Sequence, residues 1–76
     1  MEYEEVLAAL KSEIGKYYDG ELSEDLSVDD LQLVGDDLTA IALALERELR
    51  LKLDRKMYRQ IRTIADWARL LHQATG

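Results

Sequence analysis

Apolar residues recur along the chain at spacings of three and four positions, which place side chains on one face of an α-helix. This pattern predicts a first helix over residues 3–17, with glutamates in its first turn, where the helix dipole favours negative charge. The Asp19-Gly20 pair that follows is a turn signal. The predicted apolar face consists of Tyr3, Leu7, Leu10, Ile14 and Tyr17.

A second helix is predicted over residues 36–50, and either Asp36 or Asp37 is expected to cap its N-terminus. Its apolar residues extend nearly all round the helix, which is typical of a helix at the centre of a fold. The apolar residues at helical spacing are Leu38, Ile41, Leu45 and Leu49, supplemented by Ala40, Ala42, Leu43 and Ala44.

Two further helices are predicted, a short third helix over residues 55–61 and a last helix over residues 64–73. The sequence from Thr63 to Asp66 has the form of a capping box, in which two side chains satisfy the first backbone N–H groups of a helix. We expect one core formed by Leu10, Ile14, Ile41, Leu45, Leu49, Ile61, Ile64 and Trp67.

The connection over residues 19–35 is long and acidic, but apolar residues recur through it, so we expect it to be held against the core. Within it, Ser27 and Asp30 have the spacing of a helix cap and predict one short turn. No strand pattern and no internal repeat appear. The pattern therefore predicts an all-α fold, a small four-helix bundle with a long structured loop between its first two helices, as a single domain over residues 1–76.

Composition supports a small folded protein of 76 residues, because 47% of them are apolar and 34% are charged. The chain contains no cysteine, so it has no thiolate nucleophile and no zinc–thiolate site. Its apolar runs are far shorter than a membrane span of ~20 residues, and its acidic N-terminus does not resemble a signal peptide. We expect a cytoplasmic monomer.

Charge is divided unevenly along the chain. Residues 1–46 contain 13 acidic and 2 basic side chains, whereas residues 47–76 contain 3 acidic and 8 basic ones. Arg55, Lys56, Arg59 and Arg62 are expected on one side of the third helix, where they could contact phosphates or a protein partner. The overall acidity and the absence of a helix-turn-helix pattern favour a protein partner over nucleic acid.

The candidate reactive residues do not form a catalytic set. Asp29, Asp30, Asp36 and Asp37 cluster in sequence but lack the alternating ligands of a calcium loop, so no metal site is predicted. His72 is the only histidine, is expected to be exposed, and has no partner at helical spacing for a catalytic pair. An enzyme is therefore not expected.

Three segments of the sequence resemble the acyl carrier proteins of fatty-acid and polyketide synthesis. The segment from Ala44 to Leu49 is similar to the family's Ala-Leu-Glu-x-Glu-Phe ending of the second helix. Residues 61–66 are similar to its Ile-Thr-Thr-Val-x-Asp step into the last helix, and residues 28–31 to its acidic-Leu run. The spacings match without a gap from about Gly15 to Leu71, so the resemblance implies an acyl-carrier-type bundle.

The chain departs from this family at the position that carries the cofactor. In the family, a serine in an Asp-Ser-Leu motif at the start of the second helix is modified with 4'-phosphopantetheine. Without a gap, that serine corresponds to Gly35; in a second register, shifted by two residues and similar to peptidyl carrier domains, it corresponds to Asp37. Neither residue offers a hydroxyl, so no cofactor is expected; the serines of the chain are Ser12, Ser23 and Ser27.

The resemblance therefore implies a carrier-like domain that recognises proteins in a fatty-acid, polyketide or related assembly, with a synthase or modifying enzyme as partner. The residues that it places at the docking surface, with two from the basic third helix, are Asp36, Asp37, Ala40, Glu46, Arg47, Arg55 and Arg59. One alternative is a working carrier modified at Ser27 or altered at the attachment serine. Another is a small apolar-ligand binder that uses the second helix.

Overall fold

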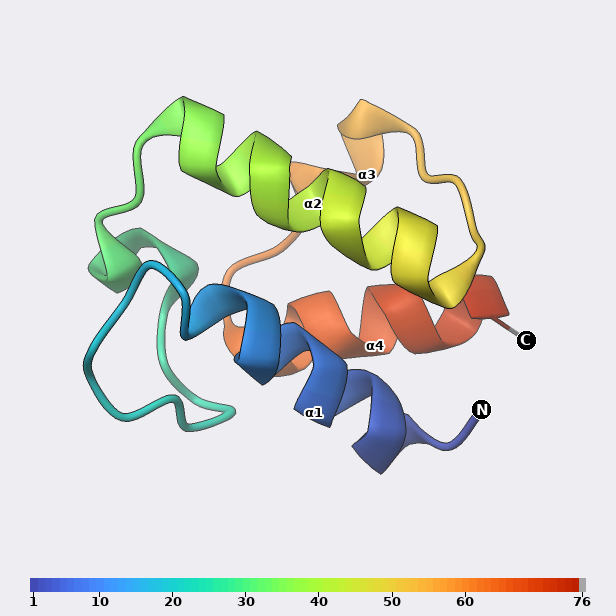
Figure 1. Ribbon diagram of the computed structural model, residues 1–76, viewed down its shortest axis with the longest axis horizontal. Helices are drawn as coiled ribbons and strands as arrows, with labels where there is room; N and C mark the ends of the chain where they lie inside the picture. Colours follow the sequence, from blue (N-terminus) through green and yellow to red (C-terminus); the bar gives the residue numbers. More distant parts are fainter. Residues whose placement is uncertain (76) are drawn as a thin grey trace.

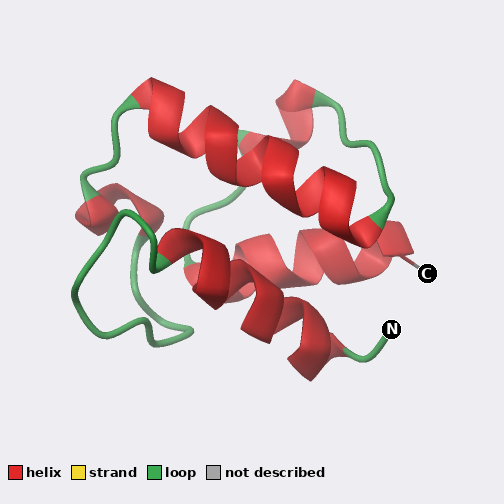
Figure 2. Ribbon diagram, in the orientation of Figure 1, coloured by secondary structure: helices red, strands yellow, loops and turns green. Residues whose placement is uncertain are grey.

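The computed structural model describes residues 1–75, which form four α-helices and one short 3-10 helix, with no β-strand among them (Figures 1 and 2). Helix α1 packs against both α2 and α4, and the short α3 lies beside α2. The all-α prediction is confirmed. The elements are α1 (Tyr3–Ile14), η1 (Val28–Leu31), α2 (Gly35–Leu49), α3 (Arg55–Tyr58) and α4 (Ile64–Thr75).

Helix α1 buries Leu10 and Ile14, as predicted, together with Val6, which was not part of the predicted face. Val6, Leu10 and Ile14, spaced four apart, are fully buried, whereas Tyr17 is 43% exposed. The helix ends at Ile14, because the next residues form a turn in which the N–H groups of Tyr17 and Tyr18 both donate to the Ile14 carbonyl oxygen. The prediction that the helix continues to residue 17 and that Tyr17 joins its apolar face is therefore wrong.

Helix α2 begins one residue earlier than predicted, at Gly35, with Val34 as N-cap and no side-chain cap. The expectation that Asp36 or Asp37 caps the helix is therefore wrong. Both carboxylates lie inside the first turn, where they complement the helix dipole. At the other end Arg50 adopts a left-handed conformation, with φ of 56°, and the Leu51 N–H closes the helix by donating to the Glu46 carbonyl oxygen at 2.9 Å.

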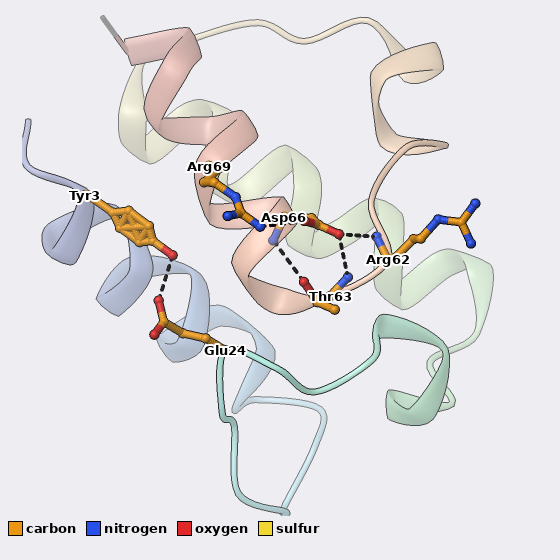
Figure 3. Close-up of polar contacts among 6 residues, drawn as sticks. All are labelled: Tyr3, Glu24, Arg62, Thr63, Asp66 and Arg69. Atoms are coloured by element: carbon orange, nitrogen blue, oxygen red, sulfur yellow. Dashed lines mark hydrogen bonds and ion pairs between the residues drawn. The ribbon is translucent and has the colours of Figure 1, made fainter.

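The long acidic connection is held against the start of α4 by backbone hydrogen bonds. The N–H of Val28 donates to the Arg62 carbonyl oxygen at 2.9 Å, and the N–H of Ile64 donates to the Leu26 carbonyl oxygen at 3.0 Å. Farther back, the Tyr3 hydroxyl donates to a Glu24 carboxylate oxygen at 2.7 Å (Figure 3). The prediction that this loop is structured is confirmed.

The short turn predicted within this connection and the capping box predicted before α4 are both present. The Ser27 hydroxyl caps η1 by accepting the Asp29 N–H at 3.3 Å. Before α4, the Thr63 N–H donates to an Asp66 carboxylate oxygen and the Asp66 N–H donates to the Thr63 hydroxyl, both at 3.2 Å (Figure 3). This reciprocal pair is the capping box that the sequence predicted.

Helix α3 is shorter than the predicted helix over residues 55–61. Only Arg55–Tyr58 is α-helical, and the chain continues to Ile61 through tighter turns, in which each N–H donates to the carbonyl three residues before it. Arg59 is the C-cap of α3, and Arg62 lies beyond these turns. The four basic residues therefore do not form one stripe on a helix, as the sequence had suggested.

The core is formed mainly by the predicted residues. Of the eight that were expected, Leu10, Ile14, Ile41, Leu45, Ile64 and Trp67 are buried. Leu49 and Ile61 are only half-buried and pack at the edge of the core. The buried residues that complete the core outside this set of eight are Val6, Leu31, Ala68 and Leu71.

Two leucines on α2 provide a direct test of this core. Leu45 is fully buried and Leu43 is 55% exposed. Leu45→Ala is expected to lower the free energy of unfolding by ~2–5 kcal/mol, because it leaves a cavity in the core. Leu43→Ala is expected to change it by about 0.5 kcal/mol or less, since it removes little buried area. Urea denaturation measures both, and equal losses would contradict the assigned orientation of α2.

The α4 capping box predicts a pH dependence. A hydrogen bond from Arg69, followed by those from the Thr63 and Arg62 N–H groups, lowers the pKa of Asp66 below its ordinary 3.8. The ionised Asp66 carboxylate therefore stabilises the fold above pH 3.8, and this stabilisation is lost as the pH falls through the lower pKa that Asp66 has in the folded state. Asp66→Asn is expected to lower the melting temperature at neutral pH, and its difference from the unmodified chain should shrink in acid.

Asp25→Asn is the control for this experiment, because Asp25 is exposed and its carboxylate makes no hydrogen bond among residues 1–75. Its melting temperature is expected to follow that of the unmodified chain across the pH range. An Asp66→Asn difference that stays constant into acid would show that the carboxylate charge does not stabilise the helix start.

Candidate functional site

A cavity of about 430 Å³ opens between α2, α3 and the start of α4. Its volume lies within the range of ~300–1,000 Å³ that is common for ligand sites. Most of its lining is apolar, and it comes from three helices and from the segments that join them. The main apolar contributors are Leu38, Ala42, Leu43, Leu53, Ile61 and Trp67.

Two aromatic residues place hydrogen-bond donors at the cavity without acceptors. The rings of Tyr58 and Trp67 meet edge-on, with their centroids 6.4 Å apart at 85°. Both residues line the cavity, and neither the Tyr58 hydroxyl nor the Trp67 indole N–H has a hydrogen-bond partner. Both polar atoms are buried beneath the cavity surface, and the Glu46 carboxylate lies near the Tyr58 hydroxyl.

Glu46 is the carboxylate in the cavity lining, and its role is partly structural. One of its oxygens accepts the Leu53 N–H at 2.8 Å, which ties the connection after α2 back onto that helix. Burial of the phenol, and then the negative charge of Glu46, raise the pKa of Tyr58 far above its ordinary value. The two side chains interact electrostatically, but no hydrogen bond between them has acceptable geometry. The phenol therefore remains protonated.

Basic side chains stand at the border of this cavity. Lys52, in the connection after α2, and Arg55, at the start of α3, both contribute to its lining and are exposed. Lys56 and Arg59 are exposed but do not line it. Arg62 borders a second, more open hollow on the α4 side, and its guanidinium points away from the capping box (Figure 3).

The entrance of α2 is an exposed and open position. Gly35 and Asp36 are exposed and Asp37 is half-buried. A Cβ atom at Gly35 would meet no atom within 4 Å, so a larger residue fits there. Neither Gly35 nor Asp37 carries a hydroxyl, so the entrance does not fit covalent attachment of phosphopantetheine.

The proposed docking residues of α2 do not all share one surface. Asp36, Ala40 and Arg47 are exposed and, together with Leu43, fall at spacings of four, three and four, which place them on one outer face. Glu46 lies instead at the cavity and bonds to the backbone. We call Asp36, Ala40, Leu43 and Arg47 the outer face of α2.

No known family model matches this chain, and no curated protein is significantly similar to it.

Within residues 1–75, no group of three His, Asp or Glu side chains could hold a metal ion. No helix among them is long and apolar enough to cross a membrane. His72 is half-buried, and its ring lies 6.0 Å from that of Tyr3, so the expectation that it is exposed is wrong.

Sequence reasoning missed the cavity itself. Lys52, Leu53, Tyr58 and Trp67 lie on different segments and share no periodicity that would link them. The single clue was the apolar character of α2 on most sides. Leu43 accounts for part of this apolar character, because its side chain is exposed on the outer face of α2 and also lines the cavity.

Proposed function

We propose that this chain is an acyl-carrier-like domain without the attachment serine, and that it acts by binding a protein of a fatty-acid, polyketide or related assembly. The observation that carries the proposal is the open entrance of α2, where Gly35 is exposed and surrounded by free space but provides no hydroxyl. The order of one helix, a long held loop, a second long helix, a short third and a last helix is consistent with it.

The outer face of α2 supports binding to a protein rather than chemistry. It presents an acid at Asp36, an apolar side chain at Leu43, which is 55% exposed, and a base at Arg47. Such a mixed face allows specific charge pairing around an apolar contact. Its charge is less negative than the family resemblance would imply, so we propose a partner that does not require a strongly acidic helix.

Restoring a serine tests the proposal. Incubated with a broad-specificity phosphopantetheinyl transferase and coenzyme A, the unmodified chain is expected to gain no mass. Gly35→Ser combined with Asp36→Leu restores the serine and the leucine of the family motif at an open position and is expected to become modified. Asp37→Ser tests the second register. Mass spectrometry of the intact chain measures each result.

Gly35→Ala combined with Asp36→Leu is the matched control, because it differs from the restored motif by one oxygen atom. If the wild-type chain gains phosphopantetheine at Ser27, the working-carrier alternative would be favoured, although the Ser27 hydroxyl already caps η1. If every serine variant keeps its helical circular-dichroism spectrum but none is modified, the carrier-like assignment of the entrance is wrong.

A small apolar ligand is the second candidate, and the cavity of about 430 Å³ favours it. Trp67 lines the cavity and is the only tryptophan, so its fluorescence reports directly on binding there. Decanoate is expected to change this fluorescence saturably. Ala42→Phe, which fills the cavity, should weaken binding about tenfold or more, whereas Ala40→Phe on the outer face should not.

Decanoate binding that Ala42→Phe leaves unchanged would place the ligand outside the cavity. Absence of any saturable signal would remove this second candidate while leaving the protein-binding proposal intact.

A further inference from the structure

The cations around the cavity have no anionic partners among the described residues 1–75. Among residues 1–75 the ion pairs are Lys16–Glu13 and Arg69–Asp66, so Lys52 and Arg55 form none. Ionised side chains at the border of an apolar cavity attract a group of opposite charge and steer its approach. The border therefore has charge available for a partner.

The nearby carboxylates do not neutralise this border. One oxygen of Glu46 is occupied by the Leu53 N–H, and Asp54 caps α3 by accepting the Lys56 N–H at 3.0 Å. Over residues 47–62 the sequence has seven basic and two acidic side chains. Of the charged side chains that line the cavity, Lys52 and Arg55 are basic and Glu46 is acidic, so the lining keeps a net positive charge although the whole chain carries −6.

The apolar surface continues beyond the cavity. Leu43 lines the cavity but remains 55% exposed on the outer face of α2. A small molecule enclosed by the cavity would leave much of this surface in water. A protein segment that lies across α2 and α3 would cover it and could insert a side chain into the cavity.

We propose that the cavity between α2 and α3 is a docking site for an acidic protein segment, which inserts an apolar side chain while its carboxylates pair with Lys52 and Arg55. This inference rests on the proposed function, because it names the chemistry of the protein that the chain binds. The border cations account for the acidity of the partner, while the apolar lining of the cavity and the chain's net charge of −6 favour a protein segment over a nucleic acid.

A peptide selection tests the proposal. The intact chain is used to select binders from a random peptide display library, and the enriched peptides are expected to share a large apolar residue flanked by Asp or Glu. An enriched peptide is then synthesised, and its dissociation constant is measured through Trp67 fluorescence. Enrichment of basic peptides, or no shared pattern, would overturn the proposal.

Two double variants with the same change in charge locate the site. Lys52→Glu with Arg55→Glu is expected to weaken binding of the selected peptide about tenfold or more. Lys56→Glu with Arg59→Glu, which alters cations outside the cavity, is expected to weaken it much less. Equal weakening by both would show only general electrostatic attraction, and would overturn the assigned pairing.

The apolar anchor has its own pair of variants. Leu43→Ser is expected to weaken the peptide about tenfold or more, and Val34→Ser, which changes a residue that is 63% exposed but lies outside the cavity lining, is expected to have little effect. Melting temperatures of all variants are measured in parallel. If Lys52→Glu with Arg55→Glu lowers the melting temperature without changing binding, these cations instead balance the acidic loop and the proposal is wrong.

The outcome is separable from the test of the proposed function. Failure of the serine variants together with an acidic consensus would remove the carrier-like assignment and keep this docking site. A modified serine variant without an acidic consensus would do the reverse. If the selected peptide fails to bind and decanoate binds in its place, the cavity serves a free amphiphile and not a protein segment.

Discussion

The backbone hydrogen bonds between the acidic loop and the start of α4 hold the rest of this fold in place. Residues 24–28 bond to residues 62–65 at distances of 2.9 to 3.0 Å, in an extended contact that a loop of this length could not keep by apolar anchors alone. The contact fixes where α4 begins and brings η1 over the core, so that Leu31 is 4% exposed. It thereby sets the position of Trp67, and with it one wall of the cavity.

The same backbone contact explains why the acidic loop and the basic second half of the chain need no ion pairs between them. The loop brings acidic residues toward the basic second half of the chain, yet only one of the two ion pairs among residues 1–75, Arg69–Asp66, lies in that half, and it is local. The acidic loop is bound through its backbone, so its carboxylates need no basic partner for the fold. The cations of residues 52–62 are left exposed for the same reason. The exposed charges therefore contribute little to the stability of the fold and remain available for contacts at the surface.

Much of the fold could be predicted from the sequence, because periodicity identifies helices even when it does not fix their rotation. Ile41 and Leu45 were identified because every alternative face of α2 is shorter. In α1, however, Tyr3, Leu7 and Val6 lie on overlapping rows, and only packing against α4 and α2 decides that Val6 is buried. The cap of α2 was missed because the helix begins at Gly35, where no side chain signals a start.

The candidate site was less predictable, because it joins residues that are distant in sequence. The entrance of α2 is a local feature and was visible as Gly35, Asp36 and Asp37. The cavity depends on how the connection after α2 returns to that helix, through the bond from Leu53 to Glu46 at 2.8 Å. Through that bond Glu46, an expected docking residue, also supports the cavity wall. The entrance and the cavity are thus separate features of α2, because none of Gly35, Asp36 and Asp37 lines the cavity.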